Sequence, residues 1–410
     1  MGWPKHLLES LCIEFTDGNW VESKDQSPEG VRLIQTGNVG EGVFKGRDDK
    51  ARYISEATFS RLKCFEIFEG DCLISRLPEP VGRSCVLPDT GERMITAVDC
   101  TVVRFDTKKI LPSFFNYYSQ SRVYLNDIDE QTSGATRKRI SRKNLGKIRI
   151  PLPPIPEQKR IVAILDKAFA DIDQARALTE QNLKNARELF ESYLQQVFSQ
   201  RGEEWVDGYL ENLVSEDCSL SYGIVQPGDD FPDGLPVVRP TDLTRETIEV
   251  EGLKRINPSN GAGYSRTVLQ GGELLVCVRG STGTTSVASE ELAGANVTRG
   301  IVPVRLNPEK VLQRFGYYQF ASPSIQTQIQ AGTYGAALMQ INIRDFKKIK
   351  MLVPPLSIQK TIVDKLDDVK PDLVRVEEIY AIKILAFDEL KKSLLQKAFS
   401  GELTRSSEAA

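Results

Sequence analysis

The chain contains one unit of about 200 residues twice, and this duplication limits its fold more than any other feature of the sequence. Residues 140–166 align without gaps on residues 341–367, and 11 of 27 positions are identical. Looser matches at the same offset of about 201 include Gly134 with Gly335 and Phe198 with Phe399. The segments between these matches differ widely. A repeat with matching junctions and divergent bodies predicts one scaffold that carries two different specificities.

The body of each unit has the pattern of a mixed α/β domain. Apolar, β-branched segments of strand length, bounded by Gly, Pro or Asp, lie at 72–75, 97–105, 273–278 and 300–306. A Pro-Pro pair closes each body, at Pro153-Pro154 and at Pro354-Pro355, and stiffens the exit of the chain.

After each Pro-Pro pair the apolar residues recur in steps of four and three, which predicts a long amphipathic helix. Roughly 43 residues give a rod of about 64 Å. Because two such rods match by the repeat, we expect them to form an intramolecular coiled coil rather than two separate core helices. The side chains expected to pack in it are Leu165, Ile172, Leu189, Tyr193, Leu366, Leu373, Phe387 and Leu394. Pro371 predicts a kink or a restart in the second rod.

The expected fold is therefore a tandem duplication of mixed α+β domains joined by two long antiparallel helices that form a coiled coil. We place the first domain at 1–155, the central helix at 156–202, the second domain at 203–356, the C-terminal helix at 357–402 and a flexible tail at 403–410. The junction from Phe198 to Trp205 is nearly recreated if Phe399 is followed by Trp3. This predicts a pseudo-two-fold axis, with the two ends of the chain close together.

The motifs of several enzyme classes are missing from the sequence. A single histidine, His6, leaves no histidine-based triad, and neither a phosphate-binding Gly-x-x-x-x-Gly-Lys-Ser/Thr loop nor the Asn/Asp-Pro-Pro-Tyr/Phe motif of amino-methyltransferases is present. We therefore expect no catalytic residue and no metal site. Seven cysteines without a Cys-x-x-Cys pair, and the lack of a long apolar stretch, predict a cytoplasmic protein with reduced thiols and no membrane contact.

The densest basic segment follows a Ser-Gly-Ala-Thr turn in the first body. Its cations, which we call the basic segment, are Arg137, Lys138, Arg139, Arg142 and Lys143. On a loop, such side chains can reach phosphates and base edges of DNA, although a solvated strand end has the same composition. The net charge of −3 predicts that DNA binding by the isolated chain is weak or depends on a partner.

Other polar residues lie beside turns at predicted strand ends, where they can project into a groove of DNA. Arginine can bind guanine bidentately, and glutamine or asparagine can do the same for adenine. These candidate contacts are Gln35, Asn38, Arg76, Arg83, Arg239, Arg279, Thr282, Arg299 and Tyr334. For any single residue among them, a structural ion pair at the surface is the alternative interpretation.

The segment PPIPEQKRIV ending at Val162 and its partner PPLSIQKTIV ending at Val363 resemble the specificity subunits of type I restriction–modification enzymes. The resemblance covers essentially the whole length and includes the helix end LQKAFSGEL and the segment RLIQTGN ending at Asn38. It implies that each body is a target-recognition domain that reads one half of an asymmetric, bipartite site in double-stranded DNA. The helices then set the spacer and dock two methyltransferase subunits.

The resemblance also implies a non-catalytic subunit of a larger complex. The methyltransferase subunits would bind S-adenosylmethionine and methylate adenine N6, and motor-nuclease subunits would use ATP and Mg²⁺, so that this chain would bind none of these cofactors. A type IIB-like or methylation-only system is compatible with the same sequence. Two further hypotheses stay open: a coiled-coil adaptor whose bodies bind proteins, and a self-contained methyltransferase or nuclease.

Overall fold

The computed structural model of the chain describes residues 3–134, 137–200, 202–336 and 338–404. The chain divides into two compact units. Unit 1 consists of Met1–Thr179 and Ile382–Ala410, and unit 2 of Glu180–Ala381. Each unit therefore combines one globular domain with part of each of two long helices.

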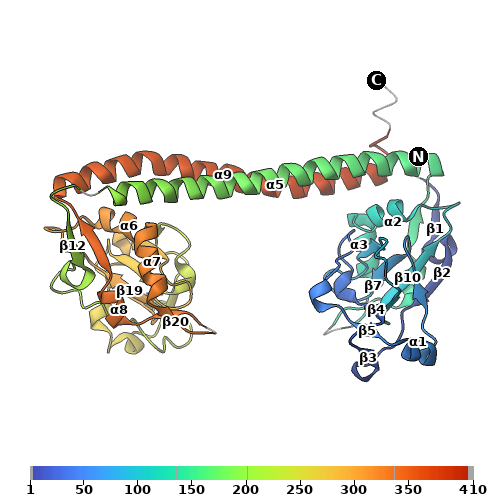
Figure 1. Cartoon of the computed structure of the whole chain (residues 1–410), viewed down its shortest axis with the longest axis horizontal. Coiled ribbons are helices and arrows are strands. Elements are labelled where there is room, and N and C mark those ends of the chain that lie inside the picture. Colours follow the sequence, from blue (N-terminus) through green and yellow to red (C-terminus); the bar gives the residue numbers. More distant parts are fainter. Residues whose placement is uncertain (1–2, 135–136, 201, 337, 405–410) are drawn as a thin grey trace. The chain divides into compact units, whose positions relative to one another are not determined.

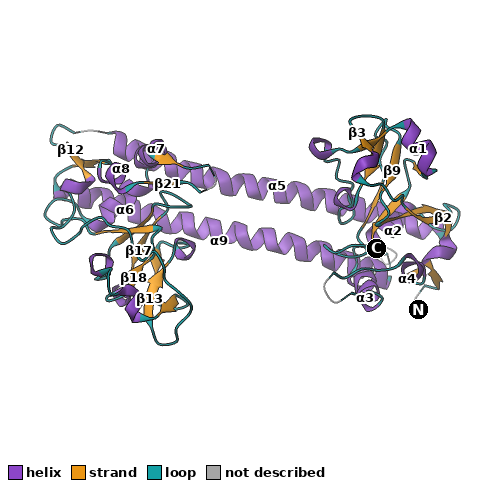
Figure 2. Ribbon diagram, turned by 90° about the horizontal axis from the view of Figure 1, so that it is seen from below, coloured by secondary structure: helices purple, strands orange, loops and turns teal. Residues whose placement is uncertain are grey.

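The long helices are α5 (Ile155–Ser199) and α9 (Leu356–Ser400), each of 45 residues. Within each unit they lie side by side (Figures 1 and 2). Helix α9 continues through Pro371, so the expected restart there is wrong. Pro371 is exposed, and the carbonyl that its missing N–H leaves free can be hydrated. None of the described helices is long and apolar enough to cross a membrane.

Ion pairs between α5 and α9 show that the two helices are antiparallel, as the sequence predicts. In unit 1, Arg176 lies 2.5 Å from Asp388, and Asp173 lies 2.5 Å from Lys391. The residue number thus rises along α5 as it falls along α9. In unit 2, Arg187 lies 2.6 Å from Glu377.

The described residues of unit 1 form three sheets. A small antiparallel sheet pairs β1 (Lys5–Leu7) with β11 (Arg149–Pro151). An antiparallel sheet has the order β2 (Cys12–Asp17), β10 (Cys100–Phe105), β7 (Cys72–Ser75) and β8 (Ser84–Val86). A mixed sheet has the order β3 (Gln26–Ser27), β5 (Tyr53–Ile54), β4 (Val31–Ile34), β9 (Met94–Thr96) and β6 (Glu66–Ile67). The short helices are α1 (Glu56–Leu62), α2 (Pro112–Tyr118), α3 (Arg122–Glu130) and α4 (Arg142–Gly146).

In unit 2, the part of the chain that the structure describes forms four sheets. Two of them are the pairs β12 (Val206–Tyr209) with β22 (Lys350–Val353), and β20 (Thr333–Tyr334) with β21 (Gln340–Ile341). A four-stranded sheet has the order β14 (Thr247–Ile248), β17 (Thr285–Ala288), β16 (Leu274–Cys277) and β19 (Ile301–Val304). A three-stranded sheet has the order β15 (Lys254–Ile256), β13 (Leu235–Val238) and β18 (Asn296–Val297). The short helices are α6 (Gln313–Ala321), α7 (Pro323–Ala331) and α8 (Ile343–Lys347).

The two domains share their topology as well as their sequence junctions. Strand β4 pairs in parallel with β9, and β13 pairs in parallel with β18. Strand β7 pairs antiparallel with β10, just as β16 pairs antiparallel with β19. The expected duplication of a mixed α+β domain is therefore present in three dimensions.

The main core of each unit joins the globular domain to the long helices. In unit 1, Leu165 of α5 and Leu395 of α9 are buried in one cluster with the aromatic side chains of α2. In unit 2, Leu366 of α9 and Leu194 of α5 take part in the corresponding cluster around α6. The apolar stripes of the helices are thus covered by their domains as well as by each other.

The described ends of the chain meet in unit 1, which confirms the expected closure. Trp3, Phe399 and Leu403 pack against the same core cluster. A Cβ at Gly401 would lie 3.7 Å from Cζ2 of Trp3. Leu403 packs against this cluster and Thr404 is buried, whereas residues 405–410 lie outside the described residues, where the expected flexible tail stays a prediction.

Candidate nucleic-acid interface

Each domain carries a short β-hairpin after a helix, and the two hairpins have the same register. In unit 1, Ser133 and Arg139 form an antiparallel bridge, each N–H donating to the other's carbonyl at 2.9 Å. In unit 2, Tyr334 pairs with Gln340, the positions that the repeat offset predicts. We call the described residues 133–134 and 137–139 the unit 1 hairpin, and the described residues 334–336 and 338–340 the unit 2 hairpin.

Both hairpin turns depend on a glycine. Gly134 and Gly335 have φ angles of 110° and 118°. A Cβ would lie 2.4 Å from the carbonyl oxygen of Arg137 in the first case and 2.3 Å from that of Leu338 in the second. Glycine fits this backbone without strain or clash, so the glycine that the two units share here is a structural requirement.

The basic segment runs from the unit 1 hairpin into α4, and all five of its cations are exposed. Lys138 lies 2.6 Å from Asp129, and Arg139 lies 3.1 Å from Asp99. Within the part of the chain that the structure describes, Arg137 and Lys143 have no ion-pair partner. Exposed ion pairs contribute only about 0–1 kcal/mol, so a phosphate can replace these carboxylates at small cost.

Arg76, which we expected to face DNA, is 5% exposed beneath the unit 1 hairpin. Its Nη2 donates to the carbonyl of Val98, and its carbonyl accepts the N–H of Ile140 at 3.3 Å. Burial lowers the pKa of Arg76, and Asp17 at 3.5 Å opposes that shift. The structure therefore makes Arg76 a support for the hairpin rather than an exposed contact.

Arg83 and Asn38 belong to the scaffold, which corrects their assignment as candidate DNA contacts. Arg83 is 9% exposed and donates to the backbone carbonyls of residues 36, 39, 77, 78 and 80 at 2.7–3.0 Å. Asn38 accepts the N–H of Gln35 at 3.0 Å and donates to the carbonyls of Lys45 and Gly46 at 2.9 Å. Their polar atoms are thus already used. Gln35 is half-buried, and its contact with DNA stays a prediction.

In unit 2, the corresponding edge carries arginine and tyrosine side chains around the hairpin. Arg299 and Tyr334 are exposed, whereas Arg279 is half-buried and its Nε has no hydrogen-bond partner among the described residues. Tyr222 donates to the carbonyl of Ile341 at 3.3 Å. Burial raises the pKa of Tyr222, and the charges of Arg299 and Arg279 act in the opposite direction. No periodic or motif signal in the sequence pointed to Tyr222.

Two other expected contacts of unit 2 lie in turns. Arg239 binds Asp242 bidentately, with Nε at 3.1 Å and Nη2 at 2.8 Å, so its guanidinium is partly occupied. Thr282 is half-buried in the turn after β16, where its N–H donates to the carbonyl of Gly280 at 2.9 Å. Neither arrangement tests a contact with DNA, which stays a prediction for both residues.

A buried glutamine fixes the start of each long helix to its domain. The Oε1 of Gln158 accepts the N–H of Leu111 at 2.9 Å, and its Nε2 donates to the carbonyls of Lys109 and Pro153, both at 2.9 Å. Gln359 makes the same three bonds at 2.8 Å, to the residues 201 positions further on. Both side chains are fully buried. The shared Gln in the two Pro-Pro segments was the signal for this role.

The predicted helix packing holds with one exception. Leu165, Ile172 and Leu366 are buried, and the other expected positions are half-buried, but Leu189 is 73% exposed. A pair of helices covers only a narrow seam, and Leu189 lies at its edge. With Phe190, Val369, Leu373 and their neighbours it lines an apolar groove of about 430 Å³ in unit 2.

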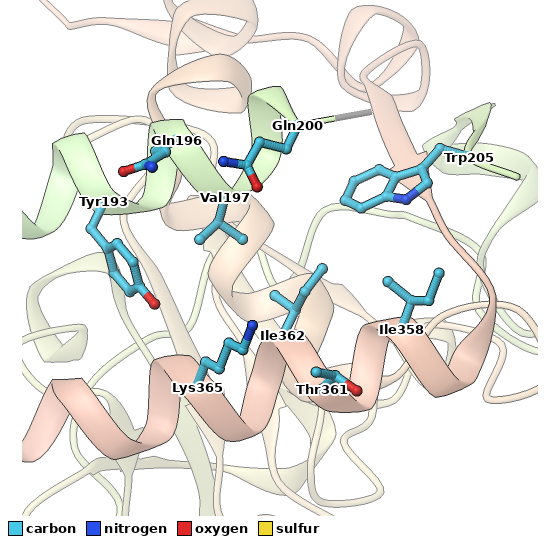
Figure 3. A pocket seen from close by; sticks show the side chains of 9 residues that line it. All are labelled: Tyr193, Gln196, Val197, Gln200, Trp205, Ile358, Thr361, Ile362 and Lys365. Carbon is cyan, nitrogen blue, oxygen red and sulfur yellow. The ribbon is translucent and has the colours of Figure 1, made fainter. Parts of the chain in front are cut away.

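A second cavity, of about 390 Å³, lies where α5 ends and α9 begins in unit 2. Figure 3 shows Val197 from the last turn of α5 and Gln200, the residue after that helix, facing Ile358 and Ile362 from the first turns of α9, with the indole of Trp205 beside them. The repeat places Trp205 here in unit 2 as it places Trp3 in unit 1. This cavity adjoins the apolar groove, since Tyr193 lines both.

One group of carboxylates in the described part of the chain is compact enough for a metal ion. Glu249, Glu251 and Glu291 have oxygens within 4.8 Å of one another. All three side chains are exposed, and clusters of exposed acidic groups commonly hold no ion, so we assign no metal site.

The fold is a tandem duplication of a mixed α+β domain on a pair of long helices, and comparison with known proteins gives its family. The family described as type I restriction modification DNA specificity domain matches residues 19–183 and 228–383. The chain belongs to this family. The resemblance inferred from the two Pro-Pro segments is thereby confirmed.

Two curated relatives are specificity subunits of type I restriction enzymes. The EcoBI subunit of Escherichia coli is 26% identical over 312 residues, which cover 70% of this chain and 65% of that protein. The EcoKI subunit of Escherichia coli (strain K12) is 24% identical over 74% of this chain and 68% of its own length. The chain thus spans just under two thirds of the first relative.

Solved structures share the tandem fold. A chain from a study of complex assembly and conformational transition of the type I R-M system has a TM-score of 0.74 and 19% identity over 98% of both chains. The HsdS subunit of Thermoanaerobacter tengcongensis has a TM-score of 0.53 and 18% identity, over 98% of this chain and 97% of its own.

Proposed function

We propose that this chain is the DNA-recognition subunit of a type I restriction–modification complex and that each domain binds one half of an asymmetric, bipartite target. One observation carries the proposal: the same scaffold occurs twice and presents different side chains at the same edge. That edge carries the basic segment in unit 1, and in unit 2 it carries Arg279, Tyr222 and Tyr334, each of which pairs with or hydrogen-bonds to residue 340 or 341. Because the two domains carry different side chains at this edge, we expect them to recognise different DNA sequences.

The two edges suggest different contributions to binding. The exposed cations of unit 1 suit phosphates, which supply affinity that depends on salt. The paired arginines of unit 2 suit guanine O6 and N7, which supply specificity. The long helices separate the two half-sites, because the spacing of half-sites follows the geometry of the protein that binds them.

The apolar groove of unit 2 is our candidate docking surface for a methyltransferase subunit. Exposed apolar side chains such as Leu189 and Val369 form a contiguous surface there, and such patches mark protein–protein contacts. By the repeat we propose two methyltransferase subunits per chain. These would carry S-adenosylmethionine, motor-nuclease subunits would use ATP and Mg²⁺, and this chain would have no catalytic role.

Salt-dependent binding tests the proposal. The full chain, alone and with its methyltransferase subunit, should bind duplex DNA with an affinity that falls linearly in a log–log plot against salt. Replacing Arg137, Lys138 and Arg139 by alanine should weaken binding and reduce the slope by about 0.9 for each phosphate that the variant no longer neutralises. Fluorescence anisotropy between 50 and 200 mM salt, about the range used for such slopes, measures both quantities.

The exposed Lys108, which lies just before α2 in the same unit, provides a matched control. Lys108→Ala removes a cation outside the proposed interface and should leave the slope unchanged. Binding by the unmodified protein that does not respond to salt would reject the DNA-recognition function. An unchanged slope in the triple variant would remove only the basic segment from the interface.

A further inference from the structure

The tip of the unit 2 hairpin is apolar, although the matching tip of unit 1 is cationic. The positions of Arg137 and Lys138 in unit 1 are those of Leu338 and Met339 in unit 2. Leu338 and Met339 are each 46% exposed, and Tyr334 at the base of the turn is 50% exposed. One backbone thus presents opposite chemistry in the two domains.

We propose that Leu338 and Met339 contact thymine C5-methyl groups in the major groove and make the second half-site selective for thymine. This inference rests on the proposed DNA-recognition function and names residues and a base that the function alone does not give. An apolar side chain against the thymine methyl is an established mode of base readout, because the methyl distinguishes an A·T pair from the other pairs.

The tip is exposed but firmly held, as a base-reading element requires. The N–H of Gly280 donates to the carbonyl of Met339 at 2.8 Å, and Arg279 forms a β-bridge with Gln340. A Cβ at Gly280 would lie 4.0 Å from Cδ1 of Leu338, which places that side chain over the turn after β16. The hairpin therefore presents Leu338 and Met339 in a defined position without burying them.

The surroundings of the tip favour DNA over a protein as its partner. Arg279 forms a β-bridge with Gln340, and Tyr334 pairs with the same residue, so a cationic and an aromatic residue lie beside the two apolar ones. The equivalent unit 1 hairpin carries Arg137, which has no ion-pair partner among the described residues and suits a phosphate. Because the two hairpins occupy equivalent positions in the duplicated domains, we expect both of them to contact DNA.

Deoxyuridine provides the test, because it differs from thymidine only by the missing methyl. A duplex is first selected from a random pool by the full chain with its methyltransferase subunit. Thymines are then replaced by deoxyuridine in one half-site or in the other, on both strands. The unmodified protein should bind about fourfold more weakly for each contacted methyl that is removed, and only for one of the two half-sites.

The double variant Leu338→Ala with Met339→Ala should bind the thymine duplex with similarly reduced affinity and should no longer distinguish it from the deoxyuridine duplex. Arg137→Ala should lower the salt slope and keep the distinction. Val206→Ala, which shortens another exposed apolar side chain of unit 2, should change neither quantity.

Several outcomes would overturn the inference while leaving the proposed function in place. These are equal affinity of the unmodified protein for both duplexes, a thymine preference retained by the double variant, and selected half-sites without thymine. Weaker capture of the methyltransferase subunit by the double variant, with the thymine preference intact, would assign the tip to a protein contact. DNA binding by the unmodified protein that is absent or insensitive to salt would instead reject the function itself.

Discussion

The arginines beside the turns of unit 1 fall into two groups that differ in burial. Arg76 and Arg83 are directed into the domain, whereas Arg137 and Arg139 are exposed on the hairpin. In the sequence all four lie near Gly, Ser, Thr or Pro. The difference arises from backbone carbonyls that converge on Arg83 from two loops, one around Val39 and one around Pro78. A convergence of distant carbonyls leaves no trace in the local sequence.

The buried hydrogen bonds of Arg83 lead to a prediction that separates structure from DNA contact. Arg83→Lys should lower the thermal unfolding midpoint of the full chain by roughly 6 °C or more, because one ammonium cannot replace a planar guanidinium and the abandoned carbonyls cost about 3 kcal/mol. Differential scanning calorimetry measures this shift. The salt slope of DNA binding by the folded variant should equal that of the unmodified protein, and a smaller slope would return Arg83 to the interface.

At the scale of elements, the long helices and their antiparallel pairing followed from periodicity and repetition. Periodicity did not predict which residues of the apolar stripe are buried. Leu189 fits the apolar register, yet it is exposed, while Phe190 one position further on packs against the core of unit 2. Where the apolar stripe of a helix is wide, the domain that packs against the helix determines which part of the stripe is buried. That choice depends on tertiary contacts rather than on the helix sequence.

The buried side chains of Gln158 and Gln359, which we call the glutamine clamp, fix the start of each long helix to its domain. Gln158→Ala should expose the Leu111 N–H to exchange, and Gln359→Ala should do the same at Leu312. Each change leaves three buried backbone groups without a hydrogen-bond partner, which costs about 1–3 kcal/mol for each group. Hydrogen exchange at the amide of Leu111 or Leu312, the reporter amide, should therefore accelerate by at least about tenfold. Amide exchange followed by mass spectrometry provides the measurement.

Gln181→Ala, which removes an exposed glutamine of α5, is the matched control and should leave both reporter amides protected. If Gln158→Ala leaves Leu111 equally protected, the clamp does not hold the helix to the domain.

For the whole molecule, the duplication accounts for most of what the sequence reveals. It predicted two related domains, the helix pair and the meeting of Trp3 with the end of α9, because each follows from placing one unit twice. It could not predict where the units differ in chemistry. Tyr222 and the apolar tip at Leu338 lie in divergent segments, where no matching residue in the other unit points to their role.

Ion pairs along the helices should connect the two repeats energetically. Arg176→Asp places like charges next to Asp388 and should destabilise the helix pair, and Asp388→Arg should do the same beside Arg176. Combining the two changes restores the attraction in reverse. The expected coupling is about 0.5–1 kcal/mol, since both side chains are partly exposed, and it should shrink at high salt. A double-mutant cycle based on denaturant unfolding measures it, and additive effects would show that the pair contributes nothing.

The charges of these helix contacts are exchanged between the repeats. At the offset of the duplication, Arg176 corresponds to Glu377, and Asp388 corresponds to Arg187, so one ion pair occurs twice with opposite polarity. Two copies of the first repeat would bring Arg176 against Arg187, and two copies of the second would bring Glu377 against Asp388. At this position the helices of the two different repeats therefore attract each other, whereas the helices of two identical repeats would repel each other. In evolutionary terms, a fresh doubling of either half would begin from mutual repulsion between its two helices at this position.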